Sequence, residues 1–521
     1  MPVNIKPIVF SNPLKGLTKD YTGALTAAVS GEEFEYSRTN GVDPFRQGFV
    51  GHISPAQIFN SPSPITDANI NSHIRAMVND SGNSYQYLLL GGLSGVAPRV
   101  ERLQSGVYNS TAAHAIVATG GNFTTIPSGT GFWGEDIITY HVSGTARVFF
   151  TFNTSTVGEM GTGTIGAGAP TYDDDFLSTH ASGFALQVNV PHKLVVGPDK
   201  VLYVTNGRYL SSYNGDTDTV LQAAYDMGPG WIITDARVVS SLLVISAVNT
   251  GSTYRLVNFS AGSRICFWNT AEPGLGEVYE IPDGHVSSLF IDENTGIYAF
   301  TSKVGDIQRL RRFEDGKWKI IKEWQSSLYG TIPQPNSVDS YRGLLVWIPG
   351  DSAGSFCLAY DPKFDALHLP YFCNDGTNDA TSMGVLKNSD SNNLTISMLS
   401  SGTYELARLN GSSGYASNRD FRTNLVRLPY RSNIIGFKLF FSQMASGSSA
   451  TFSLFEGYDT MSVGGADDLL NLALTQAADG TIEEHIVDRS IADVSSFYMN
   501  FRLSGQISVI AVLVYYTNAI P

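Results

Sequence analysis

The chain has 521 residues, of which 15% are charged and 11% aromatic, and its formal net charge is -14 at pH 7. This length suits two or three domains, and 52 glycines with so few charges indicate an all-β protein with many turns rather than long surface helices. The acidic balance argues against a sequence-independent DNA-binding protein, which needs a basic face.

Three cysteines, Cys266, Cys357 and Cys373, lack the spacing of a metal site or a disulfide framework, so no cofactor or metal is expected. The first residues, MPVNIKPIVF, lack the charged-then-apolar profile of a signal peptide. The most apolar stretch, residues 507–516, is about half as long as a membrane span requires. We therefore expect a protein without a membrane anchor.

Residues 1–62 carry six prolines among polar residues and glycines and show no regular pattern. This composition favours an extended N-terminal arm laid over another surface. One interpretation is an irregular leader. The other is an arm that contacts a neighbouring subunit, with Asp43 and Arg46 as candidate interaction residues.

Residues 63–417 contain clusters of short strand patterns that recur about every fifty residues, which is typical of a β-propeller. The clearest unit, 287–324, has four strand patterns and three turns, enough for one blade. Another, within 197–216, has two strand patterns around Asn206-Gly207, a strong signal for a type I′ hairpin. The spacing predicts a divergent β-propeller of about seven blades without a regular blade motif.

Residues 418–521 have longer strand patterns with clean alternation, as in GFKLFFSQ and FYMNFRL. Such strands bury one face, and five or more of them predict a C-terminal β-sandwich of jelly-roll type. The segment 467–478, DDLLNLALTQAA, is expected to be either a helix or a long crossover loop.

Acidic runs are the first candidates for chemistry. Asp173, Asp174 and Asp175 are consecutive, so on a strand they point to opposite faces, and a solvated loop tip is the simpler interpretation than a carboxylate pair. Asn214, Asp216 and Asp218 have the first spacings of a calcium loop, but the later glycine and glutamate positions do not match.

No nucleophile elbow, phosphate-binding loop or His-Glu-x-x-His motif occurs, and the nine histidines form no metal-like pair. No catalytic residue is therefore assigned, and no enzymatic activity is expected. A propeller glycosidase would draw its carboxylates from several blades, a pattern that sequence does not reveal.

The one basic cluster is the hairpin IQRLRRFEDGKWKIIKEW. One interpretation is an interaction stripe for an acidic subunit or passing DNA, with the two odd-numbered arginines on one strand face opposite the two lysines of the partner strand. The simpler interpretation is a solvated edge strand whose cations discourage edge-to-edge pairing. The candidate residues are Arg309, Arg311, Arg312, Lys317 and Lys319.

The two ends of the chain carry a resemblance. The passage NGVDPFRQGFVGH, residues 40–52, is similar to a leader pattern of phage virion proteins, G-x-D-P-F-R-Q-P-G-Y, although the second proline is missing and Phe49 replaces the tyrosine. The stretch GSSATFSLFEGYD near the C-terminus is similar to the closing sandwich of the same proteins. The chain thus resembles propeller proteins of the tail nozzle or tail tip of tailed bacteriophages.

The resemblance implies a structural protein of the virion that forms a homo-oligomeric ring at the distal tail, contacts other tail proteins such as tube, adaptor and fibres, and lets phage DNA pass without specific binding. Two alternatives stay open. One is a protein that binds host glycans through exposed aromatic residues such as Trp133, Trp231 and Trp324. The other is a propeller polysaccharide hydrolase, which needs two carboxylates converging in the central cleft.

Overall fold

In the computed structural model the described part of the chain is almost entirely β-structure. Two helical segments have described bounds, a single turn, α1 (Phe176–Thr179), and a 3-10 turn, η1 (Pro335–Ser337). Within residues 133–368 the structure describes 133–153, 158–165, 171–180, 184–249, 262–271, 276–292, 296–303, 307–326, 330–341, 343–349, 357–363 and 365–368. Elsewhere it describes the strands named below.

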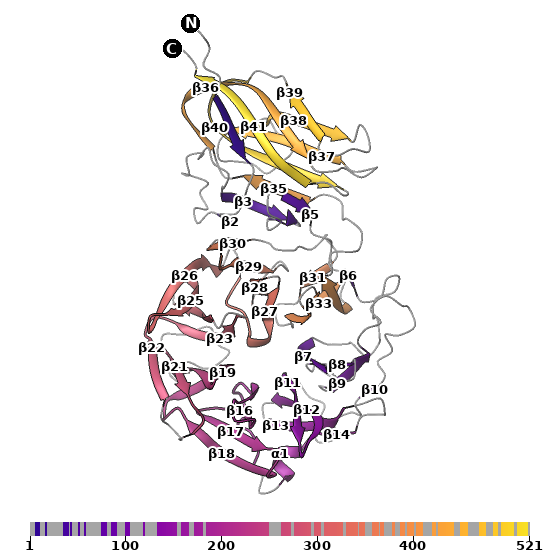
Figure 1. Cartoon of the computed structure of the whole chain (residues 1–521), viewed down its shortest axis with the longest axis vertical. Helices are drawn as coiled ribbons and strands as arrows, with labels where there is room; N and C mark the ends of the chain where they lie inside the picture. The colour runs from indigo at the N-terminus through magenta and orange to yellow at the C-terminus, as the bar shows by residue number, and fades with distance from the viewer. Residues whose placement is uncertain are drawn as a thin grey trace. The chain divides into compact units, whose positions relative to one another are not determined.

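Six four-stranded sheets and one five-stranded sheet follow one another along the chain. Figure 1 shows them standing side by side around a common axis, which is the arrangement of a seven-bladed β-propeller and confirms the predicted fold class. We number the blades 1 to 7 in chain order.

Each of the first six blades is an antiparallel meander that runs from the inner strand outward. The strands are, for blade 1, β7 (Ile74–Asp80), β8 (Tyr85–Leu90), β9 (Arg99–Gln104) and β10 (Ala118–Thr119); for blade 2, β11 (Trp133–Val142), β12 (Thr145–Asn153), β13 (Gly158–Thr164) and β14 (Tyr172–Asp173); for blade 3, β15 (Leu194–Val196), β16 (Leu202–Asn206), β17 (Tyr209–Asn214) and β18 (Thr219–Asp226); for blade 4, β19 (Trp231–Val239), β20 (Leu242–Asn249), β21 (Ser263–Trp268) and β22 (Gly276–Ile281); for blade 5, β23 (His285–Ile291), β24 (Ile297–Lys303), β25 (Ile307–Glu314) and β26 (Lys317–Gln325); and for blade 6, β27 (Val338–Tyr341), β28 (Leu344–Trp347), β29 (Leu358–Asp361) and β30 (Ala366–His368).

Blade 7 closes the ring with a strand from the other end of the propeller. It contains β31 (Asn378–Ala380), β32 (Leu386–Asp390), β33 (Asn393–Ser400), β34 (Thr403–Leu409) and, on its outer side, β6 (Gln57–Ile58). Because β6 precedes blade 1 in the sequence and pairs antiparallel with β34, the first and last parts of the propeller are held together by strand pairing.

The core lies between consecutive blades, where the two facing sheets bury apolar side chains from both. Between blades 2 and 3, for example, Phe149 and Met160 pack with Leu202 and Tyr213. All five residues of β16 are buried, so this strand is a continuous buried run rather than an alternating one. Similar clusters join blades 1 and 2, blades 3 and 4, and blades 4 and 5.

The hairpin predicted at Asn206-Gly207 forms one residue further on. Asn206 pairs with Tyr209, so the two-residue loop is Gly207-Arg208. Gly207 has a φ of 64°, as the first loop position of a type II′ turn requires. The buried Asn206 side chain instead accepts a hydrogen bond from the backbone N–H of Gln187 at 2.7 Å.

The strands at the two ends of the chain form one twelve-stranded sheet, the predicted sandwich. Its core contains Phe437, Phe452 and Phe501, whose rings pack with centroid distances of 5.4 and 5.1 Å. The strands are β1 (Lys6–Phe10), β2 (Gly16–Leu17), β3 (Glu35–Asn40), β4 (Val42–Asp43), β5 (Val50–His52), β35 (Arg419–Thr423), β36 (Val426–Phe441), β37 (Ser449–Glu456), β38 (Asp468–Thr475), β39 (Glu483–Val487), β40 (Ile491–Ser504) and β41 (Ser508–Asn518).

Two details of this unit differ from the sequence prediction. The segment expected as a helix or crossover loop is strand β38, which pairs with β37 and buries Leu470 while Ala473 is exposed. The N-terminal segment expected as an arm supplies strands, since β1 pairs with β41 and β3 with β35. The chain accordingly divides into two compact units, residues 1–56, 356–377 and 409–521 in one and 57–355 and 378–408 in the other.

Candidate functional site at the mouth of the central channel

The inner strands of four blades each carry a β-bulge near their N-terminal end. The register shifts at Arg75 in β7, Glu135 in β11, Thr234 in β19 and Ser287 in β23. A bulge inserts one residue and re-aims the side chains that follow it. In this way otherwise apolar strands present polar groups at one end of the channel.

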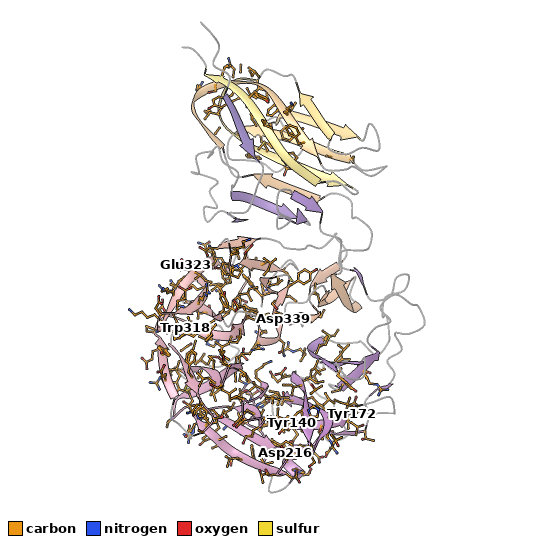
Figure 2. All side chains as sticks on the ribbon, in the orientation of Figure 1. Tyr140, Tyr172, Asp216, Trp318, Glu323 and Asp339 are labelled. Atoms are coloured by element: carbon orange, nitrogen blue, oxygen red, sulfur yellow. The ribbon has the colours of Figure 1, made fainter. Side chains whose placement is uncertain are left out.

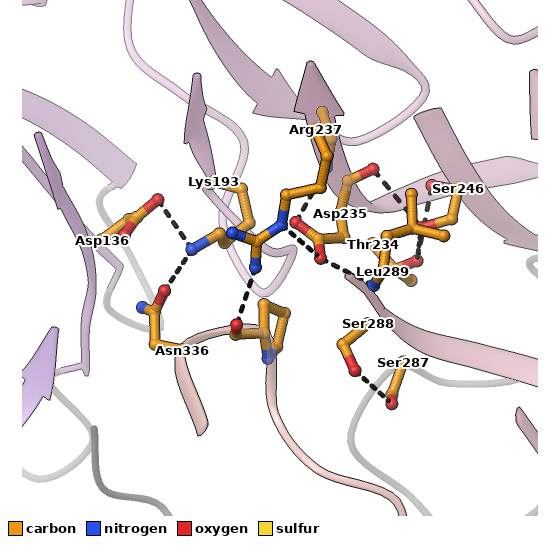
Figure 3. A network of polar contacts seen from close by, with 12 residues as sticks. Asp136, Lys193, Thr234, Asp235, Arg237, Ser246, Ser287, Ser288, Leu289 and Asn336 are labelled. Atoms are coloured by element: carbon orange, nitrogen blue, oxygen red, sulfur yellow. Dashed lines mark hydrogen bonds and ion pairs between the residues drawn. The ribbon is translucent and has the colours of Figure 1, made fainter. Parts of the chain in front are cut away.

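Asp235, the residue after the bulge of blade 4, is fully buried and links this blade to the next. Its Oδ2 accepts a hydrogen bond from the backbone N–H of Leu289 in blade 5 at 2.9 Å and pairs with Nε of Arg237 at 3.2 Å, while Oδ1 accepts from the N–H of Ala236. Burial acts to lower the pKa of Arg237, but the carboxylates of Asp235 and Asp136 outweigh it and the pKa is raised. Figure 3 shows this network.

Asp136 occupies the same place in blade 2. Its Oδ2 accepts from the backbone N–H of Leu194 in blade 3 and pairs with Nζ of Lys193, both at 2.8 Å. The side chains of Asp136 and Lys193 are both buried. Burial lowers the pKa of Lys193 even though the Asp136 carboxylate opposes this shift. Both aspartates therefore serve as acceptors that connect one inner strand to the next.

The segment from Gly330 to Ser337, which we call the axial segment, leads from blade 5 into blade 6 and crosses this end of the channel. The Asn336 amide donates to the backbone carbonyls of Arg75 at 3.2 Å and Glu135 at 2.8 Å, and its oxygen accepts from Lys193 Nζ. These contacts tie the segment to blades 1, 2 and 3, as Figure 3 shows for Asn336 and Lys193.

Two further carbonyls of the axial segment bind blades 4 and 5. Pro335 accepts from the Arg237 guanidinium at 2.7 Å, and Pro333 accepts from the Ser287 hydroxyl at 2.8 Å. The backbone N–H of Ile332 donates to Gln308 in blade 5 at 3.1 Å. The axial segment thus contacts five blades.

A pocket with a cavity volume of about 20 Å³ remains beside the axial segment. It is lined by Arg75, Glu135, Pro191, Lys193, Gln334, Pro335, Asn336 and Ser337. Asp339 in β27 lies near the middle of the propeller (Figure 2) and contributes to the raised pKa of Arg237. Among the carboxylates of β11, β19 and β27, only that of Glu135 lines the pocket. Asp136, Asp235 and Asp339 each act to raise the pKa of Arg237. No group of side chains suited to a metal ion occurs among the described residues.

None of these channel residues was among the sequence candidates. A signal was present, because polar pairs interrupt the apolar inner strands at Glu135-Asp136, Thr234-Asp235 and Ser287-Ser288. The sequence alone does not show that the pairs occupy equivalent positions in the inner strands, because each bulge shifts the alternation of side chains by one residue.

The predicted basic cluster is largely neutralised by acidic neighbours. Arg309 pairs with Asp283 and with Glu323, the latter at 2.7 Å, and Arg311 binds the other oxygen of Asp283 at 2.8 Å. Both arginine side chains are buried. They share a strand face as predicted, but the residues opposite them are Glu323 and Ile320 rather than the lysines.

The other members of the cluster lie at its exposed end. Arg312 pairs with Glu314 at 3.1 Å, and Lys319, which stands opposite Arg312, pairs with Glu314 and Asp315. Lys317 is exposed at the hairpin end. An interaction role for these cations stays a prediction, with fewer accessible charges than the sequence suggested.

Replacing Arg311 with alanine is expected to lower the free energy of unfolding by about 1–3 kcal/mol, because the buried Thr301 hydroxyl and Asp283 each lose a hydrogen-bonded partner. Replacing the exposed Lys317 with alanine should change it by less than about 0.5 kcal/mol. Urea unfolding of the two variants compares them directly. Equal effects would contradict a structural role for the buried arginine.

The remaining candidates are dispersed. Asp43 lies in β4, where its backbone pairs with Gly51, and Arg46 lies outside the described residues. Asp218, from the calcium-like spacing, binds His180 at 2.6 Å and the Tyr213 hydroxyl at 3.0 Å. No helix in the described part of the chain is long and apolar enough to cross a membrane.

The aromatic residues proposed for sugar stacking are not equally accessible. Trp324 is buried and donates to the carbonyl of Gly330 at 3.0 Å, so it is unavailable to a ligand. Trp231 is half-buried, with the Arg264 guanidinium 4.2 Å from its ring centroid. The Trp133 side chain is outside the described residues.

Comparison with known proteins gives neighbours in structure alone, since no family model and no curated protein matches the sequence. An exo-β-1,3-galactanase from Phanerochaete chrysosporium aligns with a TM-score of 0.33 and 10% identity over 89% of this chain and 99% of its own. A GH43 glycoside hydrolase with endo-xylanase and exo-arabinofuranosidase activity gives 0.29 and 10% over 86% and 99%. A puromycin-hydrolysing peptidase from Mycobacterium tuberculosis gives 0.38 and 10% over 71% and 61%.

These findings correct two predictions, the structural tail-ring protein and the absence of enzymatic activity. The solved structures just named are enzymes, two of them glycoside hydrolases, and none of the three is a phage tail protein. The ring, the tail partners, a host glycan and the virion location stay predictions. At this identity and these TM-scores the function has to be argued from the chain's own residues.

Proposed function

We propose that the propeller is a glycoside hydrolase that acts on a polysaccharide at the mouth of its central channel. The observation that supports this is the Glu135 carboxyl group in the pocket lining, together with the carboxylates of Asp136, Asp235 and Asp339, which all act on Arg237, the partner of the lining residue Pro335. Glycoside hydrolysis uses two carboxyl groups, one that protonates the leaving oxygen and one that activates water or attacks the sugar. A propeller polysaccharide hydrolase needs two carboxylates in its central cleft.

The four carboxylates divide into two kinds by their positions. Asp136 and Asp235 each accept from a backbone N–H of the next inner strand and pair with a cation, so these residues position the strands and the basic side chains. Glu135 lines the pocket, and Asp339, whose Oδ1 accepts from the backbone N–H of Ser340 at 2.7 Å, is half-buried and acts on the pKa of Arg237. We assign the acid and base roles to Glu135 and Asp339.

The test is release of reducing ends by the purified full chain from a panel that includes β-1,3-galactan, arabinoxylan, a pectin and an alginate. Glu135→Gln and Asp339→Asn should each lower kcat/KM by a factor of about 100 or more, as expected for loss of a general acid or base. Asp216→Asn changes a carboxylate at the exposed rim (Figure 2) and is the matched control, with unchanged activity expected.

Two results would overturn the proposal. One is full activity in both channel variants, which would place the chemistry elsewhere. The other is binding of a polysaccharide without any cleavage, which would favour a glycan-binding protein. Far-UV and near-UV circular dichroism of each variant checks that a loss of activity is not a loss of fold.

A further inference from the structure

The pocket as it stands is too small for the proposed substrate. A volume of about 20 Å³ holds roughly one water molecule, whereas a site for a small organic ligand occupies roughly 300–1,000 Å³. Four consecutive residues of the axial segment, Gln334 to Ser337, make up half of the lining. The space that a sugar would need at the channel mouth is therefore occupied by the chain itself.

The axial segment is held mainly by side chains of the surrounding blades rather than by strand pairing. Its described backbone hydrogen bonds lie near its ends, from Gly330 N–H to Ser326 and from Ser337 N–H to Gln334, while Ile348 N–H donates to Ser337. Between these ends the contacts are those of Asn336, Pro335, Pro333 and Ile332 with polar groups around the channel. Residues 331–336 belong to no strand, so their departure would break no strand pairing, although it would expose the buried Ile332, Pro333 and Pro335.

The groups that hold the segment are those that would recognise a polyhydroxylated ligand. They include donors, the Lys193 ammonium, the Arg237 guanidinium and the Ser287 hydroxyl, and acceptors, the backbone carbonyls of Arg75 and Glu135. In the structure each of them binds an amide or carbonyl of the axial segment. The segment thus occupies the positions that sugar hydroxyls would take.

The charges around the pocket favour a neutral ligand. Lys193 and Arg237 each have a carboxylate partner of their own. The cations near the channel mouth are Arg75, Lys193 and Arg237, and the carboxylates are Glu135, Asp136, Asp235 and Asp339. Without surplus positive charge, nothing at the channel mouth would compensate the charge of an acidic sugar, so a neutral oligosaccharide fits better.

We propose that the axial segment is a displaceable strap that closes the channel mouth and is replaced by a neutral oligosaccharide. The ligand part of this inference rests on the proposed function, whereas the opening of the strap does not. Because the strap and the ligand compete for one set of partners, the apparent dissociation constant of the ligand depends on the fraction of molecules with the strap open.

The test loosens the strap without changing the groups beneath it. Asn336→Ala removes three hydrogen bonds of the strap, and Pro335→Gly adds backbone freedom while keeping the carbonyl that Arg237 binds. Asn214→Ala is the matched control, because Asn214 binds backbone N–H groups of an exposed rim turn.

Two measurements are made on the full chain. Hydrogen exchange of the Ile332 amide, whose N–H is bound to Gln308, reports opening of the strap without ligand. The exchange should be faster in both strap variants and unchanged in Asn214→Ala. Calorimetric binding of xylohexaose and β-1,3-galactotetraose, with oligogalacturonate as the acidic probe, should show an apparent dissociation constant about tenfold lower in the strap variants for a neutral probe.

The outcomes separate the two parts of the inference. Unchanged Ile332 exchange in both strap variants would overturn the strap itself. Faster exchange together with no binding of any probe, and no hydrolysis, would overturn the ligand and the proposed function while supporting the strap. Weaker binding of a neutral probe in the strap variants would mean that the segment is a wall of the site, and tighter binding of oligogalacturonate alone would overturn the neutral ligand.

Discussion

Replacing Asp235 with alanine is expected to lower the free energy of unfolding by about 3–5 kcal/mol, because it leaves a buried ion pair without one partner. The Asp235 side chain is fully buried, and its loss removes the partner of Arg237 and the acceptor for the backbone N–H of Leu289. Leu289 belongs to the inner strand of the next blade. The substitution therefore loosens the joint between blades 4 and 5 and also leaves a charge uncompensated.

The measurement is a urea titration followed by tryptophan fluorescence. All six tryptophans of the chain lie between residues 133 and 347, so this signal reports the propeller. Asp235→Asn keeps an oxygen that can accept from Leu289 and should cost less than alanine. Asp216→Ala, at an exposed turn, should change the stability by less than about 0.5 kcal/mol. A loss below about 1 kcal/mol for Asp235→Ala would contradict the interblade role.

The strands themselves could be predicted because their local chemistry agrees with their environment. In β16 every residue is buried, and its first four residues, Leu202 to Thr205, are the apolar, aromatic and β-branched types that favour a strand. The prediction of a helix or crossover loop for the segment that forms β38 was wrong because its local sequence pattern fits both a helix and a strand. Leucines at positions 469, 470, 472 and 474 suit a helix as well as a strand, and pairing with β37 decides between them.

The site could not be predicted because its members are brought together only by ring closure. Asn336 binds the carbonyl of Arg75, 261 residues away in the sequence. The number of accessible positive charges on the basic hairpin was also overestimated, because Asp283, which pairs with Arg309 and Arg311, lies outside the hairpin. A dense local charge run is visible in a sequence, whereas its distant counter-charges are not.

The resemblance to tail proteins rested on residues 40–52 and on the C-terminal strands. Both lie in the unit that contains the twelve-stranded sheet. An acidic net charge and divergent blades are equally suited to a ring protein and to a hydrolase. The proposed hydrolase rests on carboxylates of the inner strands, on which the motifs at the two ends of the chain give no information.

Lowering the pH should destabilise the propeller through His285, which stands at the start of the inner strand of blade 5 and is 5% exposed. Burial lowers the pKa of this histidine to about 4 from its ordinary value of 6.5. Between these two values the unfolded chain binds more protons than the folded one, so stability rises with pH across this window. As the pH falls from about 6.5 to about 4, His285 should therefore remove about 3 kcal/mol of stability.

Urea unfolding of the wild type and His285→Gln at several pH values between 4 and 7 measures this contribution as a difference in slope. The variant lacks the titrating group, so its stability should fall less steeply with decreasing pH, whatever its stability at pH 7. His141→Gln, at an exposed histidine, is the control and should keep the slope of the wild type. Parallel curves for the wild type and His285→Gln would mean that the pKa of His285 is the same in the folded and the unfolded chain, which would contradict the effect of its burial.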